Sequence, residues 1–344
     1  MIVLGIESTC DETGCALVVD GKTILSNVTV SQEDIHQAFG GVVPELACRR
    51  HLEVCQRTFE RALTEGGCDA REIDLIAVAN GPGLIGALLI GLNFAKGLSW
   101  GLNKPLVGVN HVEAHLYATL MHAEPKLPAL GVVISGGHTA LLVLERVGLY
   151  RLIGQTQDDA IGEAFDKAAK LLGLPYPGGP EIEKLAFGGR ADRFSLNAGQ
   201  IKERPFDFSF SGLKTALFYL LKGQNGLKES TFNESDKKDI AASFQHAAFN
   251  DLVEKGLKAA STFQCKSIVI GGGVSQNHYL RTLFEMRSSL PLFWPPKGLS
   301  LDNAAMIAGL GYHIYHTQGE ADLNLKAFPR IHTFIVDSSS KCFF

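Results

Sequence analysis

Residues 2–19, IVLGIESTCDETGCALVV, contain two apolar runs joined by a polar turn. The first run, 2–7, ends on a glutamate, and the second run occupies 14–19. Two such runs with a short turn between them predict a pair of antiparallel strands. The same plan recurs in residues 129–147, ALGVVISGGHTALLVLERV. Two copies of one strand–turn–strand unit in a single chain indicate an internal repeat.

Each copy of this unit is followed, further along the chain, by one member of a second pair of similar segments. Residues 73–92 and 266–284 each predict a strand, a glycine-rich turn and a helix. Because the elements come in the same order in both halves, we expect an α/β protein built from two similar domains by duplication. In the second copy, the strands are expected at 129–134 and 139–146. The predicted division is an N-terminal domain at 1–125, a C-terminal domain at 126–330 with a helical insert at about 157–225, and a tail at 331–344.

The composition narrows the class of protein. The formal net charge of −4 means that nucleic-acid binding would depend on a local basic patch or a partner. The seven cysteines include no C-x-x-C pair, which favours reduced thiols and a cytoplasmic location. The N-terminus lacks the basic start and long apolar run of a signal peptide. The longest apolar stretch, 83–102, contains Asn93 and Lys96, so we expect a buried helix there and no membrane span.

Two long helices are predicted from apolar side chains at helical spacing. The first, at 44–65, is opened by Pro44, a residue that suits the first turn of a helix. The second is expected at 236–262. The apolar stripe of the first helix consists of Leu52, Cys55, Phe59 and Leu63.

Glycine-rich turns follow three predicted strands, at 81–83, 135–137 and 271–273. Glycine lets the backbone approach a ligand closely, and free amides at a helix N-terminus favour a phosphate. A single turn of this kind is better explained as an ordinary tight turn. Three such turns, each at the carboxyl end of a strand, favour a nucleotide or anion site.

His111 and His115 lie four residues apart at the start of a predicted helix, so both side chains share one face. This spacing suits two ligands of a metal ion, and it also suits two histidines on a helix surface. Glu113 lies between them, so the segment is not the H-E-x-x-H motif of a zinc protease. A metal site requires a third ligand from elsewhere in the chain.

Strand–turn–strand units with glycine turns resemble the actin–hexokinase–Hsp70 (ASKHA) class, which has duplicated RNase H-like domains with a cleft between them. Individual motifs are similar to those of one family in that class, the tRNA threonylcarbamoyladenosine transferases (TsaD, formerly glycoprotease or Gcp). They occur in the family's order from Met1 to about Arg330: GIESTCDETGCALV, GGVVPELACRRH, GPGLIGALLIG, NHVEAHL, SGGHTALL, GEAFDKAAKLLGLPYPGGP, FSFSGLKTAL, GGGVSQNHYLR and LDNAAMIA.

This resemblance implies an acyltransferase. The family moves a threonylcarbamoyl group from threonylcarbamoyl-AMP to N6 of the adenosine 3′ of the anticodon, in tRNAs that read ANN codons, and releases AMP. The alternative is a small-molecule kinase or ATPase of the same fold, which the phosphate turns would suit and the histidine pair would not.

The resemblance also implies site residues. Asp302 becomes the third ligand beside His111 and His115, for one divalent metal, Fe²⁺ or alternatively Zn²⁺. Asp11 and Glu12 become candidate catalytic residues, with turn-forming acids as the alternative. The implied substrate-binding residues are Val133, Ile134, Ser135, Gly136, Gly137, Asp166, Gly179, Glu183, Gly271, Gly272, Gly273 and Asn277.

Partners are implied as well. Bacterial members of the family work with tRNA, a shorter paralogue (TsaB-like) and a small P-loop ATPase (TsaE-like), without a membrane. We expect the paralogue to dock on the apolar surface of helices 44–65 and 84–101, where Leu63→Glu would disrupt assembly. The alternative is that both helices are buried in the core.

Overall fold

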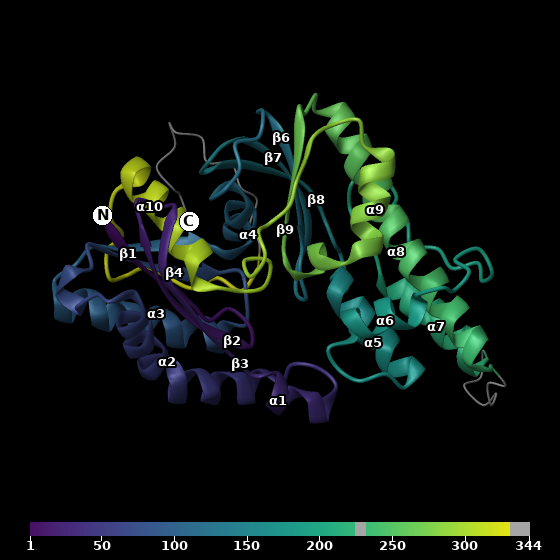
Figure 1. Cartoon of the computed structure of the whole chain (residues 1–344), viewed down its shortest axis with the longest axis horizontal. Coiled ribbons are helices and arrows are strands. Elements are labelled where there is room, and N and C mark those ends of the chain that lie inside the picture. The colour runs from purple at the N-terminus through teal and green to yellow at the C-terminus, as the bar shows by residue number, and fades with distance from the viewer. Residues whose placement is uncertain (224–231, 331–344) are drawn as a thin grey trace.

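Two five-stranded sheets form the frame of the computed structural model, which describes residues 1–223 and 232–330 (Figure 1). Within these residues, both sheets have one topology: three antiparallel strands, with the fourth strand parallel to the first. The first sheet, in the order β3-β2-β1-β4-β5, consists of β1 (Ile2–Glu7), β2 (Glu12–Val19), β3 (Thr23–Ser31), β4 (Leu75–Gly81) and β5 (Leu106–Asn110). The second, in the order β10-β9-β6-β7-β8, consists of β6 (Ala129–Ile134), β7 (Thr139–Arg146), β8 (Leu149–Gln155), β9 (Ser267–Gly271) and β10 (Leu292–Phe293).

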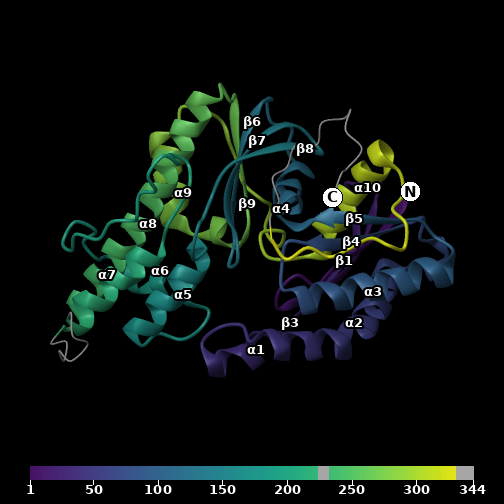
Figure 2. The same ribbon diagram turned by 180° about the vertical axis from the view of Figure 1, so that it is seen from behind.

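The helices follow these strands. The described α-helices are α1 (Glu33–His36), α2 (Pro44–Gly66), α3 (Ile85–Leu102), α4 (His111–Leu120), α5 (Ile161–Leu172), α6 (Gly178–Ala186), α7 (Ser211–Lys222), α8 (Glu234–Thr262), α9 (His278–Arg287) and α10 (Ala304–Gln318). Figure 2 shows α2 and α3 side by side below the first sheet, and α5 to α9 gathered beside the second. The two long helices predicted at 44–65 and 236–262 are confirmed as α2 and α8, with small shifts at their ends.

The predicted repeat is confirmed by the matching strand orders. The strands at 2–7, 129–134 and 139–146 have the predicted bounds, whereas β2 starts earlier, at Glu12. The sequence pattern did not predict the third strand of either sheet. In β3, burial alternates from one residue to the next, but Leu25 is exposed and Ser26 is buried, so the apolar residues of the sequence do not follow that alternation.

The last helix of each half packs against the other half. Helix α4 follows the first sheet but contacts β6 and β9, and α10 follows the second sheet but contacts β1, β2 and β4. The two helices also contact each other, and their apolar side chains share one buried cluster. Gly5 allows this approach, because a Cβ atom there would collide with the carbonyl oxygen of Ala304. Helix α10 comes from the second half of the chain and yet packs on the first sheet, so the two halves are intertwined. The domain division between residues 125 and 126 therefore stays a prediction.

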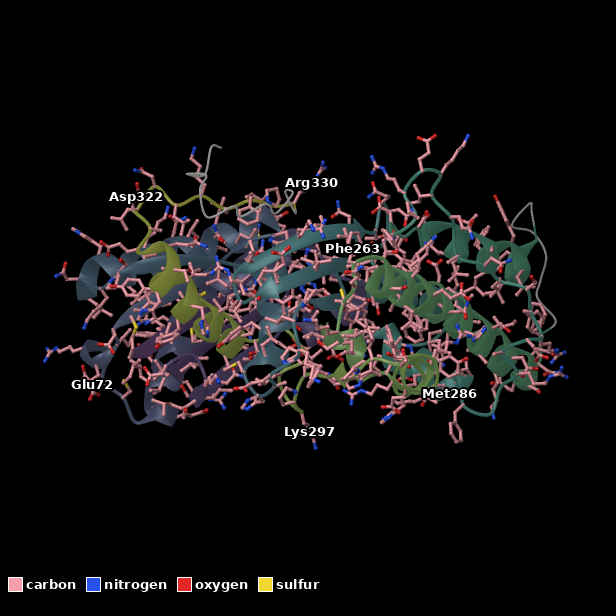
Figure 3. All side chains as sticks on the ribbon, turned by 90° about the horizontal axis from the view of Figure 1, so that it is seen from above. Glu72, Phe263, Met286, Lys297, Asp322 and Arg330 are labelled. Carbon is pink, nitrogen blue, oxygen red and sulfur yellow. The ribbon has the colours of Figure 1, made fainter. Side chains whose placement is uncertain are left out.

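The chain after α10 returns along the first sheet. The N–H of Ala321 donates to the carbonyl oxygen of Leu106 (2.7 Å), and Asn80 donates to the carbonyl oxygen of Lys326 (3.2 Å). Figure 3 labels Asp322 and Arg330 in this segment. Residues 224 and 225 of the predicted insert and the predicted tail, 331–344, lie outside the described residues.

One described helix, α3, is long and apolar enough to cross a membrane by length and composition alone. Helices in the cores of soluble proteins meet the same criterion, so it is weak support for a span. The prediction that α3 is simply buried is wrong for one of its faces, since Ile85, Leu89 and Trp100 are exposed.

Candidate active site

His111, His115 and Asp302 converge where the two halves meet. Helix α4 begins at His111 because the side chain of Asn110 caps it, accepting the N–H groups of Val112 and Glu113. The Oδ1 atom of Asp302 lies 3.1 Å from Nε2 of His115 and 3.6 Å from Nε2 of His111. One potential ligand atom from each of the three residues lies within 4.8 Å of the others. The predicted ligands are therefore brought together, although their role as ligands stays a prediction.

The chemistry of these donors fits a metal ion. In the described part of the chain, both ring nitrogens of His115 are buried without a hydrogen-bond partner, even though Nε2 lies close to Asp302. Ligand bonds of about 2.0–2.2 Å at tetrahedral angles would separate two donor atoms by roughly 3.3–3.6 Å, close to the spacing observed. Two imidazoles and a carboxylate suit Zn²⁺ or Fe²⁺ and leave coordination positions open.

The surroundings favour a positive charge at this place. Burial lowers the pKa of His111, but Glu7 and Asp302 outweigh it and raise that pKa to about 9. Burial likewise opposes ionisation of Asp302, but His111 and His115 hold its pKa well below the ordinary value.

Asp302 lies just before α10 and is not the N-cap of that helix. The N-cap of α10 is Asn303, whose side chain accepts the N–H of Met306 at 3.1 Å. Asp302 precedes this cap, so its carboxylate is not used by the helix and faces the histidines.

A residue that the sequence did not single out contacts His111 directly. The carboxylate of Glu7 is fully buried, and its Oε2 atom lies 3.0 Å from Nδ1 of His111. The signal in the sequence was an apolar strand that ends on an acid, which by itself does not reveal a partner.

Asp11 lies in the turn after β1, as predicted, whereas Glu12 is the first residue of β2, and both are largely shielded from solvent. Burial raises the pKa of Glu12 well above its ordinary value, and the charges of Asp302 and Asp11 raise it further. The effect of the Asp302 charge on the pKa of Glu12 indicates that this segment lies near the candidate metal ligands. The catalytic role of the two acids stays a prediction.

The turn at 135–137 is open on one side. A Cβ atom at Gly136 or Gly137 would have no atom within 4 Å, and no hydrogen bond is recorded for their N–H groups among the described residues. The N–H of Ser135, in contrast, donates to the carbonyl oxygen of His138 (2.8 Å), so only the two glycine amides are available to an anion. Val133 and Ile134 have fully buried side chains and could offer only main-chain groups.

Three further predicted substrate residues already have partners within the protein. Asp166 accepts the N–H of Gly178 at 2.7 Å, and Glu183 accepts the N–H of His278 at 2.7 Å. Asn277 caps α9 through the N–H of Leu280 and donates to Gln245. Gly179, beside Asp166, has open space around its Cα.

Asp166 provides a pH-dependent test. Burial raises its pKa from 3.8 to about 6, with smaller effects from Asp11 and Glu163. Because the folded-state pKa lies above the ordinary value, this contribution to stability is present below about pH 4 and is lost as the pH rises through about 6. Asp166→Asn should therefore gain up to about 3 kcal/mol of unfolding free energy relative to wild type between about pH 4 and pH 7. Chemical denaturation at several pH values measures this, and a difference that does not change with pH would contradict it.

The glycines at 271 and 272 serve chain packing. A Cβ atom at Gly271 would collide with the carbonyl oxygen of His115, and one at Gly272 with that of Ile134. Gly272 also has a φ of 96°, in the left-handed region. A side chain at Gly272 would therefore collide with the main chain and strain the fold. At Gly273, a Cβ atom would lie 2.8 Å from the side chain of Leu301.

The chain is similar to many proteins that share one family name. The family model TsaD, tRNA N6-adenosine threonylcarbamoyltransferase, matches residues 23–309. A tRNA N6-adenosine threonylcarbamoyltransferase from Protochlamydia amoebophila is 60% identical over 326 residues, which cover 94% of this chain and 95% of the relative. The protein of the same name from Chlamydia trachomatis serovar A is 52% identical, with 92% and 93% covered.

Solved structures match the fold at low identity. Full-length HypF in its phosphate- and nucleotide-bound form gives a TM-score of 0.60 at 14% identity, covering 93% of this chain and 47% of HypF. Component A of (R)-2-hydroxyglutaryl-CoA dehydratase from Acidaminococcus fermentans gives 0.54 at 15% identity, covering 91% and 98%. These likenesses support the architecture alone.

Proposed function

Because the chain belongs to the TsaD family of tRNA N6-adenosine threonylcarbamoyltransferases, it is an acyltransferase that modifies tRNA, and we propose how its residues carry out the transfer. The donor is threonylcarbamoyl-AMP and the acceptor is N6 of the adenosine 3′ of the anticodon. The observation that supports this reading most is the convergence of His111, His115 and Asp302 from segments far apart in the chain. The alternative, a small-molecule kinase or ATPase, is not favoured by the relatives.

The chemistry is attack of an amine on a carbonyl carbon. A bond forms between N6 and the carbamoyl carbon, the bond from that carbon to the phosphate oxygen breaks, and AMP leaves with the electron pair. One proton is lost from N6. We assign its acceptance to Asp11 or Glu12, two adjacent acids at the start of β2, where the charge of Asp302 acts on Glu12.

His111, His115 and Asp302 would hold one divalent cation, Fe²⁺ or alternatively Zn²⁺. Such an ion, when bound, supplies a Lewis acid and orients the acyl group. The amides of Gly136 and Gly137 would hold the phosphate and stabilise its charge as AMP leaves. Asp166, Gly179 and Glu183 would contribute to the adenosine pocket. We also propose a cytoplasmic location.

The proposed reaction is tested by release of AMP from threonylcarbamoyl-AMP. The release should depend on both tRNA and a divalent metal, and mass spectrometry of the tRNA nucleosides should show threonylcarbamoyladenosine. Release of AMP without tRNA, at the same rate, would indicate a hydrolase and contradict the transfer.

We propose that the shorter paralogue docks on α2 and α3, with the P-loop ATPase completing the assembly. A groove of about 450 Å³ lies between the two helices, and apolar Leu52 and Leu89 on its walls are 74% and 45% exposed. Leu63 is partly buried against the core, whereas Cys55 and Phe59 are buried, so Leu63→Glu would be a poor test. Leu52 is the better position.

Leu52→Glu is expected to weaken binding of the paralogue by at least about 100-fold. A carboxylate buried at an interface without a partner costs several kcal/mol, and 1.4 kcal/mol corresponds to tenfold. Met286→Glu is the matched control, because Met286 is 79% exposed on α9, in the other half of the protein (Figure 3). Size-exclusion chromatography with the paralogue measures the effect. Equal co-elution of both variants with the paralogue would show that this surface is not the interface.

A further inference from the structure

Glu7, the last residue of β1, is a carboxylate with no contact to solvent. Its two oxygens have different partners. Oε1 accepts the N–H of Thr9 at 2.6 Å, and Oε2 lies 3.0 Å from Nδ1 of His111. A carboxylate that ends a buried strand would be costly without partners, so these two interactions define its environment.

The contact with Glu7 determines which nitrogen of His111 carries a proton. An ionised carboxylate only accepts hydrogen bonds, so Nδ1 must donate. In the neutral ring, the free lone pair is then on Nε2, the nitrogen that lies 3.6 Å from Asp302. Histidine ligands commonly donate their second ring N–H to a carboxylate, which fixes the ring and makes the ligand more basic.

We propose that Glu7 is a positioning residue that holds His111 with its Nδ1–H toward β1 and its Nε2 toward the metal. This inference rests on the proposed function in one respect, namely that His111, His115 and Asp302 bind a metal. Glu7 touches neither the substrate nor the metal, and it acts through His111.

The geometry requires a carboxylate at residue 7. Two donors, the N–H of Thr9 and Nδ1–H of His111, converge on the two oxygens of Glu7. Glutamine would present one oxygen and one NH₂ group, so one of the two donors would face another donor. Glu7→Gln is nearly equal in size to the native residue and nevertheless cannot satisfy both contacts.

The charges agree with this role. Glu7 and Asp302 are two acids that flank His111, and together they match the charge of a divalent cation. His115 lies beside Asp302 at Nε2, but among the described residues its Nδ1 atom has no hydrogen-bond partner and therefore no second carboxylate. Glu7 therefore supports His111 and not His115.

Thr9 is the competing partner for His111. Its hydroxyl oxygen lies 3.2 Å from the same Nδ1 atom. If Thr9 orients the ring, Thr9→Val should be as harmful as Glu7→Gln, because valine keeps the shape of threonine and removes the hydroxyl. If Glu7 orients the ring, Thr9→Val should change little.

The test measures Zn²⁺ affinity by competition with a chromophoric chelator, without tRNA or donor. Glu7→Gln is expected to bind Zn²⁺ roughly 10- to 100-fold more weakly than wild type. Thr9→Val should stay within a few-fold of wild type. Glu113→Gln is the matched control, since Glu113 is also a buried acid of this region, lies in α4, and its carboxylate makes no hydrogen bond with the described residues.

The outcomes separate the two proposals. If His111→Ala retains wild-type Zn²⁺ affinity, the metal site itself is wrong. If His111→Ala loses Zn²⁺ but Glu7→Gln binds it as wild type does, only the role of Glu7 is overturned. An effect of Glu113→Gln equal to that of Glu7→Gln would also overturn it, because loss of any buried acid would then suffice.

A measurement on the unmutated protein covers the case in which Glu7→Gln does not fold. Nitrogen-15 NMR of labelled histidine distinguishes protonated from metal-bound ring nitrogens. With Zn²⁺ bound, His111 should retain a proton on Nδ1 and bind metal through Nε2, with His111→Ala used to assign the signal. Metal binding through Nδ1 would overturn the proposal.

Discussion

His115→Ala is expected to leave only traces of bound metal and to lower the rate of tRNA modification by at least about 100-fold. Two ligands would remain of the three that the site requires, and changes to outer residues alone cost roughly 10- to 100-fold in metal affinity or activity. Apart from the 3.1 Å approach of its Nε2 atom to Asp302, the ring of His115 has no polar partner within the described residues, so its removal disturbs only the candidate metal site. Metal content by mass spectrometry and AMP release in the presence of tRNA measure the two effects.

His122→Ala is the matched control for this experiment. His122 follows α4 by two residues and is exposed, so its removal changes the histidine content of the same segment without touching the site. The control should retain metal and activity. Full metal occupancy in His115→Ala, with activity lost, would mean that His115 acts on the substrate and not on a metal.

The repeat was visible in the sequence because both copies have the same short-range pattern. Apolar runs, polar turns and glycines all act within about 20 residues, so β1, β6 and β7 could be predicted with their exact bounds. The exchange of α4 and α10 between the halves could not be predicted. It depends on which apolar faces meet across the chain, and on Gly5, where the absence of a Cβ atom lets α10 approach β1.

The residues of the candidate site likewise fall into those that local spacing predicts and those that depend on long-range contacts. The spacing of His111 and His115 placed both rings on one helical face, but no spacing connects them to Asp302, about 190 residues later. That residue came from the resemblance to the family. Glu7 was missed because a strand-ending glutamate has no periodic signature, and only the tertiary fold brings it within 3.0 Å of Nδ1 of His111.

Glycine turns were the least informative signal. The pattern alone cannot distinguish a glycine that faces a ligand from one that another strand approaches closely. In the structure, Gly137 has open space where a Cβ atom would lie, whereas at Gly272 that place is occupied by the main chain of Ile134. The two positions therefore differ in a way that mutation can measure.

Gly272→Val is expected to lower the unfolding free energy by about 2–5 kcal/mol. A left-handed backbone costs a residue with a side chain roughly 1–2 kcal/mol, and overpacking costs typically 1–3 kcal/mol. The colliding atom belongs to the carbonyl group of Ile134, the last residue of β6, so relief would require β6 and β9 to move apart. Denaturant unfolding followed by circular dichroism measures the loss.

Gly137→Val is the matched substitution, because the same side chain enters open space and Gly137 has no left-handed φ. Its stability should stay within about 1 kcal/mol of wild type, as for most exposed positions. Since the amide of Gly137 is proposed to hold the phosphate, this variant should instead bind AMP more weakly in a calorimetric titration. The two glycines thus predict opposite results, one losing stability and the other losing affinity. A stable Gly272→Val with weakened AMP binding, beside a Gly137→Val that binds AMP normally, would reverse the assignment and place the ligand at the end of β9.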